Sequence, residues 1–267
     1  MIELTFLGTG TSNGIPVIGC DCAVCTSSDP RNHRGRTSAV VRYGGHTILI
    51  DTATELRLQA LATGLKQIDA VLFTHAHADH TGGFDDLRRF NEIAGRHLPV
   101  YASPETARAL RERFAYAFVD QYTFYGGKPD LTLTVVEGPF SLFGLEVVPI
   151  PVEHGRMSVT GYRFGPLAYV TDAKRIPPSS LALLRDLDIL VINALRERPH
   201  PTHMSLSEAV AVVEELRPRA AYLVHLSHEL SHERAESLLP PGIAVAYDGL
   251  RIRTSVPAPR MSDHDRD

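Results

Sequence analysis

The chain has 267 residues, of which 43% are hydrophobic and 22% are charged. This composition is ordinary for a globular protein and excludes a disordered chain, a collagen-like repeat and a coiled coil. The formal net charge of −4 argues against capture of DNA or RNA by phosphate neutralisation, and no apolar run approaches the roughly 20 residues that a membrane span needs. Met1–Leu4 lacks the basic region of a signal peptide, so we expect a cytoplasmic protein.

Strand-like and helix-like segments alternate along the whole chain. Because no low-complexity linker separates the two halves, we expect one α/β domain over residues 1–255, with two packed sheets, and a polar, disordered tail over residues 256–267. In chain order, the pattern predicts strands over Ile2–Gly8, Ser38–Arg42 and Thr47–Ile50, a helix over Glu55–Ala62, a strand over Val71–Phe73, helices over Phe84–Ala94 and Pro104–Phe114, strands over Leu131–Val136, Leu142–Pro149, Thr160–Phe164 and Leu167–Val170, a helix over Ser179–Leu184, a strand over Ile189–Ile192, a helix over Ser205–Leu216, and strands over Ala221–Val224, Ala244–Ala246 and Leu250–Arg253.

The densest group of ionisable residues is His75-Ala76-His77-Ala78-Asp79-His80, directly after the strand around Val71–Phe73. Three imidazoles and a carboxylate within six residues are costly to crowd together unless a cation binds them. Alternate residues of a turn can point the same way, so His75 and His77 can hold one ion while Asp79 and His80 hold another. A solvated polar loop is the alternative.

Further candidate ligands occur at the ends of other predicted strands. His154 follows the strand that ends at Pro149, Asp172 follows Leu167–Val170, and His225 follows Ala221–Val224. A single histidine at a strand end is more often structural. Several independent strand-end ligands, together with the His-rich loop, favour a metal centre.

With these motifs, and with the opening Phe6-Leu7-Gly8-Thr9-Gly10, the sequence resembles the metallo-β-lactamase superfamily over nearly its whole length. The resemblance implies a four-layered αβ/βα sandwich with a dinuclear metal site along one edge of the sheets. It also implies that Asp51 orients a ligand or the loop without binding metal; a helix N-cap is the other reading of this residue. The resemblance assigns His75, His77 and His154 to the first metal, Asp79, His80 and His225 to the second, and Asp172 to a bridge between them.

The chemistry of this superfamily requires the complete ligand set. Two divalent ions that share a bridging water lower its pKa and give hydroxide near neutral pH. Because every ligand is present, a member that has lost its metals is disfavoured. The residue types do not decide between zinc, manganese, iron and nickel.

All three cysteines of the chain fall within six positions, at Cys20, Cys22 and Cys25. Neighbours this close form disulfides poorly but suit a zinc ion, whose tetrahedral geometry needs a fourth ligand. His228, three residues after His225, is the natural candidate. A Cys-x-Cys-x-x-Cys segment with a His-x-x-His pair resembles the PhnP-type phosphodiesterases, cyclic-phosphate hydrolases of the carbon–phosphorus lyase pathway, in which it holds a structural zinc. Three free thiols and a surface histidine are the alternative.

One further histidine fits this subfamily. His203 lies just before the predicted helix Ser205–Leu216, where PhnP-like enzymes carry a catalytic histidine. An imidazole there can donate a proton to a leaving alkoxide or hold a phosphoryl oxygen; a histidine that contacts backbone at a helix entry is the structural alternative. His200 is a competitor that matches less well. Asp79 is expected to act catalytically as well, by tuning the water.

Three segments have open interpretations. Asn193–Arg198 departs from the phosphodiesterase pattern, which leaves the substrate pocket undefined. Arg31, Arg34 and Arg36 can meet a phosphate, although ion pairs or a solvated face are more common for such residues. The aromatic segment Phe114–Tyr125 is expected to pack in the core, with a lid or a dimer contact as alternatives.

The resemblance therefore implies a metal-dependent phosphodiesterase with two catalytic zinc or manganese ions and one structural zinc. Its substrate would be a small phosphodiester such as phosphoribosyl 1,2-cyclic phosphate. Transfer-RNA 3′ processing is a rival, but the sequence has no Lys/Arg-rich, Gly-rich arm for gripping RNA. Hydrolysis of an ester, thioester or lactone is a second rival, and a zinc-dependent scaffold or sensor is the alternative without catalysis. We expect no membrane partner, and a homodimer as the commonest oligomer.

Overall fold

The computed structural model describes residues 1–119 and 127–255. The expected tail and the second half of the aromatic segment Phe114–Tyr125 lie outside these ranges. Within them, the strands form two seven-stranded sheets. In spatial order, the first sheet consists of β14 (Arg251–Thr254), β1 (Ile2–Gly8), β2 (Ser38–Tyr43), β3 (His46–Ile50), β4 (Ala70–Leu72), β5 (Leu98–Ala102) and β6 (Leu131–Val135), and the second of β13 (Ile243–Val245), β12 (Ala220–Val224), β11 (Ile189–Asn193), β10 (Leu167–Val170), β9 (Met157–Phe164), β8 (Leu145–His154) and β7 (Phe140–Leu142).

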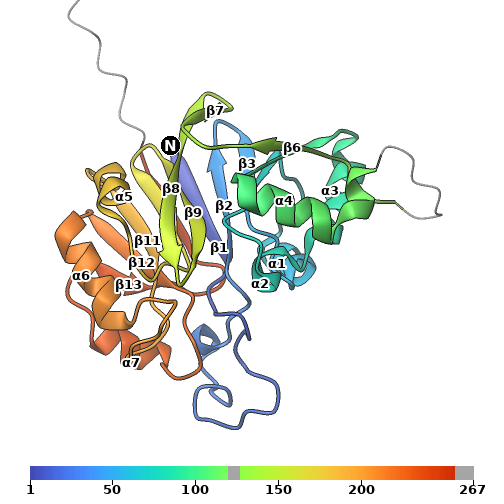
Figure 1. Cartoon of the computed structure of the whole chain (residues 1–267). Helices are drawn as coiled ribbons and strands as arrows, with labels where there is room; N and C mark the ends of the chain where they lie inside the picture. Colours follow the sequence, from blue (N-terminus) through green and yellow to red (C-terminus); the bar gives the residue numbers. More distant parts are fainter. Residues whose placement is uncertain (120–126, 256–267) are drawn as a thin grey trace, which may run out of the picture.

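Each sheet is antiparallel in one half and parallel in the other. In the first sheet the pairs are antiparallel from β14 to β3 and parallel from β3 to β6. In the second they are parallel from β13 to β10 and antiparallel from β10 to β7. Because parallel strands end at the same edge of a sheet, the loops after β3, β4, β10, β11 and β12 gather along one edge of the molecule (Figure 1).

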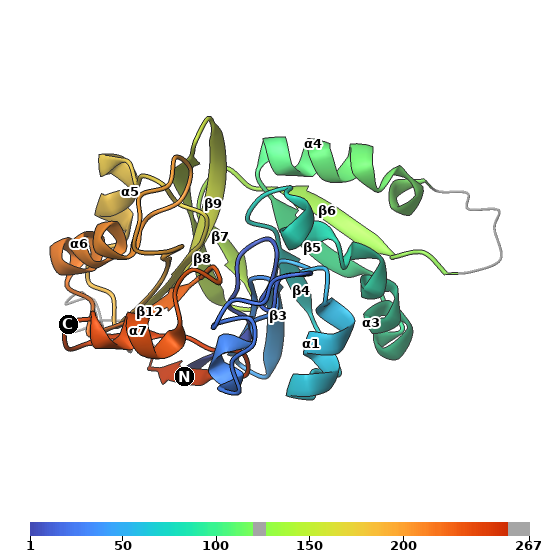
Figure 2. The same cartoon turned by 90° about the horizontal axis from the view of Figure 1, so that it is seen from below.

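Helices cover the outer face of each sheet (Figure 2). One apolar cluster lies between the sheets, where Leu4 and Ile48 belong to the same cluster as Tyr162 and Val191, and two others lie under the helices. This order of helix, sheet, sheet and helix confirms the predicted four-layered sandwich. The helices on the first sheet are α1 (Leu56–Thr63), α3 (Leu87–Ala94) and α4 (Pro104–Arg113), and those on the second are α5 (Pro178–Leu183), α6 (Leu206–Leu216) and α7 (His232–Ser237).

The structure corrects one predicted strand. The segment Leu142–Pro149 is divided between β7 and β8 by a two-residue turn at Phe143-Gly144, whose φ angles of 56° and 77° are both left-handed. Such a hairpin turn usually carries Asn-Gly or Asp-Gly, so a phenylalanine conceals it in the sequence. β8 then continues to His154, which is the last residue of the strand and does not follow a strand that ends at Pro149.

The strand β5 and the helix α7 were not predicted from the sequence. β5 is a short strand with Pro99 as its second residue, and α7 has a polar sequence with only His232 and Ala235 buried. Their tertiary neighbours stabilise both, because neither has a clear periodicity of its own. No helix among residues 1–119 and 127–255 is long and apolar enough to cross a bilayer.

The chain turns sharply at three of the strand ends. Asp51 directly follows β3 and has a φ angle of 60°, and His225 directly follows β12 and has a φ angle of 63°. Asp172 is separated from the end of β10 by one residue and has a φ angle of 58°. Non-glycine residues rarely adopt this left-handed conformation, and where they do the strain is often linked to function. The backbone thus directs these polar side chains into the edge between the sheets.

Removal of the Phe84 ring should destabilise the first half of the molecule. Phe84 is fully buried, and its ring centroid lies 4.1 Å from that of Phe114 and 6.0 Å from that of Phe73. We expect Phe84→Ala to lower the free energy of unfolding by about 3–5 kcal/mol, measured by urea denaturation. Leu58→Ala is the matched control, because Leu58 is 59% exposed. A loss below about 1 kcal/mol in Phe84→Ala would contradict the packing described here.

Candidate metal centre

The structure brings together every residue that the sequence predicts as a catalytic metal ligand. The loop after β4 supplies four of them and includes the short helix α2 (Ala78–Thr81), whose Thr81 Oγ1 donates to His77 O at 2.9 Å. The ligand atoms of three groups lie within 4.8 Å of one another. These groups are His75, His77 and His154; Asp79, His80 and His225; and His75, His80 and Asp172.

The first two groups are the sets predicted for the two metals. The third group contains His75 of the first set and His80 of the second together with Asp172, so Asp172 lies next to both predicted metal sites. Asp172 Oδ2 lies 3.3 Å from His80 Nε2, and its Oδ1 lies 3.3 Å from His225 Nε2. His75 Nε2 and His77 Nδ1 face each other at 3.0 Å. Ring nitrogens that converge in this way are typical of histidines that share a cation.

Hydrogen bonds determine which ring nitrogen of His75 and His80 carries the free lone pair. Thr74 Oγ1 donates to Asp51 Oδ2 at 2.7 Å and so accepts from His75 Nδ1 at 3.0 Å. His80 Nδ1 donates to the same Asp51 oxygen at 2.8 Å. In the neutral rings, Nε2 is therefore the nitrogen available to a metal.

The same tautomer holds for His154 and His225. His154 Nδ1 donates to Thr202 O at 2.8 Å. Thr37 Oγ1 donates to Gly10 O at 2.8 Å and so accepts from His225 Nδ1 at 3.0 Å. Burial lowers the pKa of His225, and also that of His75, so both rings are neutral, as metal ligation requires.

The contacts of Asp51 decide between its two predicted roles. Both of its carboxylate oxygens accept from Thr74, and one accepts from His80, so it orients the ligand loop as predicted. The N-cap reading is wrong, because α1 begins after Glu55.

The charge balance of this cluster fits divalent cations. Three buried carboxylates, Asp51, Asp79 and Asp172, have His80 as their neighbour, and no Lys or Arg of the described residues pairs with them. His80 Nε2 lies 3.3 Å from Asp79 and 3.3 Å from Asp172 but has no hydrogen-bond partner. Although burial raises the pKa of Asp172, the neighbouring His225 and His80 hold it well below its usual value. Carboxylates buried in such excess over basic side chains need cations, and the imidazole and carboxylate donors suit zinc or manganese.

His203 lies beside the predicted ligands. Its Nδ1 is 3.7 Å from Asp172 Oδ1, and its ring centroid is 4.5 Å from that of His154. Nδ1 is buried without a hydrogen-bond partner, so this nitrogen makes no contact with the backbone. Burial, followed by the charge of His225, lowers the pKa of His203 to about 3, so the ring is neutral. The ring centroid of the competitor His200 lies 5.3 Å from that of His203, and of the two histidines only His203 comes within 4 Å of Asp172 among the described residues.

Asn193 is a positioning residue whose role the sequence did not reveal. It is fully buried at the end of β11, where its Oδ1 accepts from Ala173 N at 2.7 Å and its Nδ2 donates to Ala173 O at 3.0 Å. Met204 N donates to the same carbonyl oxygen. Asn193 therefore links the turn that carries Asp172 to the turn that carries His203. A buried strand-end amide was the only signal in the sequence.

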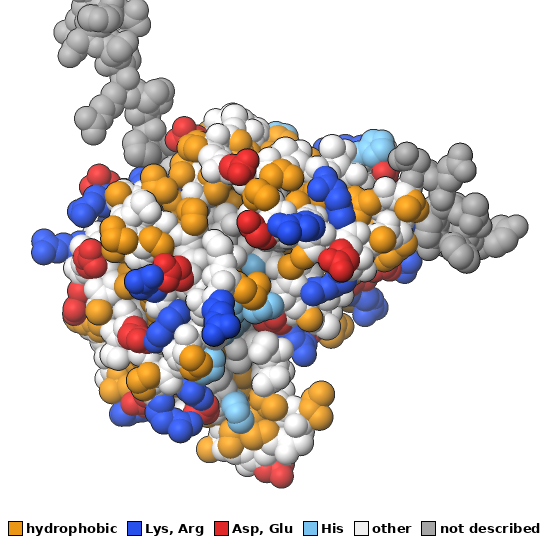
Figure 3. Space-filling model, in the orientation of Figure 1, with side chains coloured by type: hydrophobic (Ala, Val, Ile, Leu, Met, Phe, Trp, Pro, Cys, Tyr) orange, Lys and Arg blue, Asp and Glu red, His pale blue; other side chains and the backbone are white. Residues whose placement is uncertain are grey.

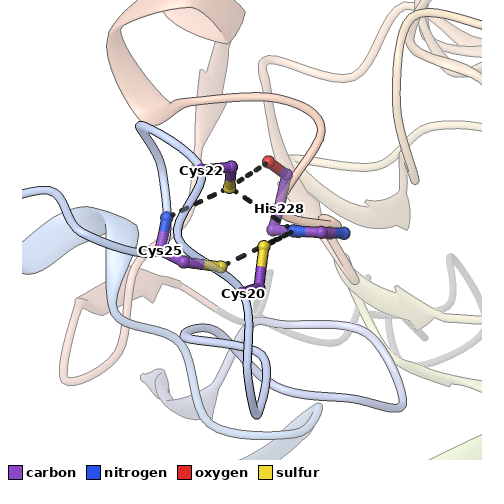
Figure 4. A group of neighbouring side chains, drawn as sticks. All are labelled: Cys20, Cys22, Cys25 and His228. Carbon is purple, nitrogen blue, oxygen red and sulfur yellow. Dashed lines mark hydrogen bonds between the residues drawn. The ribbon is translucent and has the colours of Figure 1, made fainter.

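The cysteine cluster is assembled as predicted (Figure 4). His228 Nδ1 lies 3.2 Å from Cys20 Sγ, 3.5 Å from Cys22 Sγ and 3.5 Å from Cys25 Sγ. The Cys25 backbone N–H lowers the pKa of Cys22 to about 6, whereas burial raises the pKa of Cys25 to about 11. One nitrogen and three sulfur atoms converging on one point fit a tetrahedral zinc, which would hold all three sulfurs as thiolates.

The three arginines after the cysteines make contacts within the protein. Arg31 pairs with Asp29 and Arg36 pairs with Glu55. Arg34 is buried and donates to Thr9 Oγ1 at 2.8 Å and to Ala246 O at 2.6 Å. The interpretation as ion pairs is therefore confirmed for two of them.

The described part of the aromatic segment packs as expected. Phe114 stacks on Phe84, and Ala117 is buried in the same core. Val119 is exposed, and the remainder of the segment lies outside the described residues.

Comparison with known proteins identifies the family of this chain. A family model described as the beta-lactamase superfamily domain matches residues 46–226. The chain belongs to the beta-lactamase superfamily. The crystal structure of a new diphosphatase from the PhnP family is 44% identical and has a TM-score of 0.89, with 96% of this chain and 99% of that chain covered. This superfamily member is therefore also a member of the PhnP family, as the cysteine motif predicted.

The curated relatives of this chain are named for different activities. An octanoyltransferase of Porphyromonas gingivalis is 38% identical over 264 residues, which is 97% of this chain but 53% of the relative, so the chain spans about half the length of that protein. A ribonuclease Z of Mycobacterium sp. strain KMS is 28% identical over 254 residues, or 88% of this chain and 80% of the relative.

Space-filling Figure 3 shows histidine side chains in the middle of the face that carries these loops, bordered by Lys and Arg. Within the cluster, His77 is half-buried, so part of the cluster is accessible from solvent, which a site for hydrolysis requires.

Asp51→Asn should weaken metal binding without removing a ligand. The variant loses the carboxylate that accepts from His80 Nδ1 and Thr74. We expect metal affinity at the pair of catalytic sites to fall about 10–100-fold, measured by competition with a chromophoric chelator. Asp85→Asn is the control, because Asp85 is a half-exposed carboxylate near the same loop. Unchanged affinity in Asp51→Asn would contradict its role.

His228→Ala should remove one zinc per chain. The purified wild-type protein is expected to hold one more tightly bound zinc than the variant, measured by elemental analysis after mild dialysis against a chelator, because three thiolates alone leave the tetrahedral site incomplete. His33→Ala is the control, since His33 bonds to Ser27 O near the cysteines without facing the sulfurs. Equal zinc content in His228→Ala and wild type would refute the assignment.

Proposed function

We propose that this chain is a dinuclear metal-dependent hydrolase, and specifically a phosphodiesterase for small phosphodiesters such as phosphoribosyl 1,2-cyclic phosphate. The observation that carries the proposal is the position of His203. An unpartnered imidazole nitrogen 3.7 Å from the predicted bridging ligand Asp172 is suited to a leaving oxygen at the metal centre. Membership in the PhnP family supports the same reaction class.

The residues of the site would have separate roles in this reaction. When bound, two divalent ions lower the pKa of a shared water and neutralise charge on phosphoryl oxygens. Asp172 would hold both ions, and Asp79, beside His80 and His225, would accept a hydrogen bond from the attacking water. Thr74 and Asp51 keep the ligand loop in place and so fix the direction of attack.

His203 would act on the opposite side of phosphorus from the water. As a neutral imidazole with its proton at Nδ1, it would donate a hydrogen bond to the leaving oxygen as negative charge develops there. To transfer that proton, the ring would first take up a second proton at Nε2, so that it donates as imidazolium and returns to the neutral form. Asp172 Oδ1 nearby would stabilise the positive charge of that imidazolium. This role predicts greater dependence on His203 for substrates with poor leaving groups.

A second candidate reaction is cleavage of a diphosphate. It is favoured by the 44% identical structure, which is described as a diphosphatase. The attacked phosphorus of a diphosphate ester also has two bridging oxygens, so the same ligands and His203 apply. Processing of transfer RNA is supported less, because the matched ribonuclease Z is 28% identical and the chain carries a net charge of −4.

The same proposal covers the identity of the metals, the substrate partner, the cellular location and the oligomeric state. We assign zinc to the cysteine site and zinc or manganese to the catalytic pair. The partner would be a small-molecule phosphodiester, in the cytoplasm, and the chain would form a homodimer.

The leaving group provides the test. Manganese-loaded protein is expected to hydrolyse bis(p-nitrophenyl) phosphate and a nucleoside 2′,3′-cyclic phosphate, and not the monoester p-nitrophenyl phosphate. In His203→Ala we expect kcat to fall roughly 10²–10⁴-fold for the cyclic substrate, which releases an alkoxide, and much less for the nitrophenyl diester.

His97→Ala is the matched control, because His97 is exposed and pairs with Asp130 away from the site. No diester hydrolysis by protein shown to contain its metals would refute the phosphodiesterase, and equal losses on both diesters would refute the role of His203.

A further inference from the structure

Thr11 places a hydroxyl group against the metal-facing nitrogen of His225. Its Oγ1 lies 3.1 Å from His225 Nε2. The other ring nitrogen, Nδ1, donates to Thr37 Oγ1, so Nε2 carries the lone pair and the Thr11 hydroxyl is the donor of this hydrogen bond. The Thr11 hydroxyl and a metal bound to His225 therefore use the same lone pair.

The backbone on both sides of this hydroxyl is fixed. Gly10 forms an isolated parallel bridge with Leu226, in which Thr11 N donates to Leu226 O at 3.0 Å and Leu226 N donates to Thr9 O at 3.1 Å. Thr11 O accepts from Gly14 N at 2.8 Å. Because these bonds hold the residue on all sides, and Thr11 is only 9% exposed, its side chain stays beside the His225 ring.

Metal ligation of His225 Nε2 would leave the Thr11 hydroxyl without its acceptor. Within residues 1–119 and 127–255, His225 is the one hydrogen-bond partner of Thr11 Oγ1. The neighbouring Thr9 differs, because its hydroxyl donates to Asp248 Oδ1 at 2.7 Å and accepts from Arg34 Nη1 at 2.8 Å. Buried hydroxyls rarely remain without a partner, so the new acceptor of Thr11 has to be a group bound at the metal centre.

The substrate position given by His203 brings such an acceptor to Thr11. The His203 and His225 rings stack with 4.8 Å between their centroids. Asp172 Oδ1 lies 3.3 Å from His225 Nε2 and 3.7 Å from His203 Nδ1. Thr11 Oγ1 and Asp172 Oδ1 thus flank the same nitrogen, and a phosphoryl group whose leaving oxygen faces His203 would lie beside it.

We propose that the Thr11 hydroxyl is a further catalytic group, which donates a hydrogen bond to a non-bridging phosphoryl oxygen of the substrate at the second metal. The inference rests on the proposed phosphodiesterase. Negative charge is spread over the non-bridging oxygens in the transition state, and a fixed donor aimed at one of them stabilises it. The hydroxyl keeps its proton, and no bond to Thr11 forms or breaks.

The test separates this role from that of His203 by the leaving group. Thr11→Val removes the hydroxyl and keeps the branched shape of the side chain. In manganese-loaded Thr11→Val we expect kcat/KM to fall about 10²-fold, by the same factor for bis(p-nitrophenyl) phosphate and for a nucleoside 2′,3′-cyclic phosphate, because both have non-bridging oxygens. Thr11→Ser, which keeps the hydroxyl, should recover most of this loss.

Two binding measurements by calorimetry examine the same hydroxyl without turnover. Manganese should bind Thr11→Val at least as tightly as the wild type, because the metal no longer has to displace the hydrogen bond to His225. Orthovanadate, an oxyanion with phosphate-like oxygens, should bind the manganese-loaded variant about tenfold more weakly, as expected when a hydrogen bond to a charged group is lost.

Thr63→Val is the matched control, because the Thr63 hydroxyl donates to Gln59 O at the end of α1; all its constants should equal those of the wild type. Weaker manganese binding in Thr11→Val would make Thr11 a metal ligand and overturn the proposal. Unchanged orthovanadate affinity, or a loss of kcat/KM that differs between the two diesters, would overturn it as well. If the wild type cleaves neither diester, the phosphodiesterase fails, and the orthovanadate comparison still decides the role of Thr11.

Discussion

Buried negative charge is the constraint on which this structure depends. Asp51, Asp79 and Asp172 lie in the interior without a Lys or Arg partner among the described residues. His80 lies beside all three, and Thr74 and Thr171 donate to Asp51 and Asp172. Unpaired buried carboxylates are too costly to retain unless cations neutralise them. The sandwich accommodates them because its parallel strands end at one edge, where sharp turns at Asp51, Asp172 and His225 direct the side chains inward.

The N-terminal loop connects the two expected metal sites. Thr11 and Thr37, near its two ends, both contact His225. The cysteines between them converge on His228, three residues further along the chain. A zinc at the cysteine cluster would close this loop over the end of β12, and so would hold His225 in position from both sides. Such a zinc would thereby be connected to the geometry of the second expected catalytic metal.

Local patterns in the sequence pointed to the candidate ligands and to two packed sheets, whereas the four-layer order and the division of the ligands between two metals came from the resemblance to the superfamily. Apolar strands followed at once by His or Asp identified His75, Asp172 and His225, and the cysteine spacing identified the second site. The turn at Phe143-Gly144 was missed because its phenylalanine adopts a conformation usual for glycine or asparagine. Asn193 was missed because its function is a contact with Ala173, twenty residues away in the chain, and depends on the pairing of β10 with β11.

The metal ligands and the choice of substrate are separate matters in this fold. The ligands lie on strand ends that the sheets hold rigidly, and relatives named diphosphatase and ribonuclease Z match the chain across this frame. Because proteins named for different activities share the frame, the metal ligands alone do not determine which substrate is cleaved. The choice of substrate therefore depends on side chains outside the ligand set.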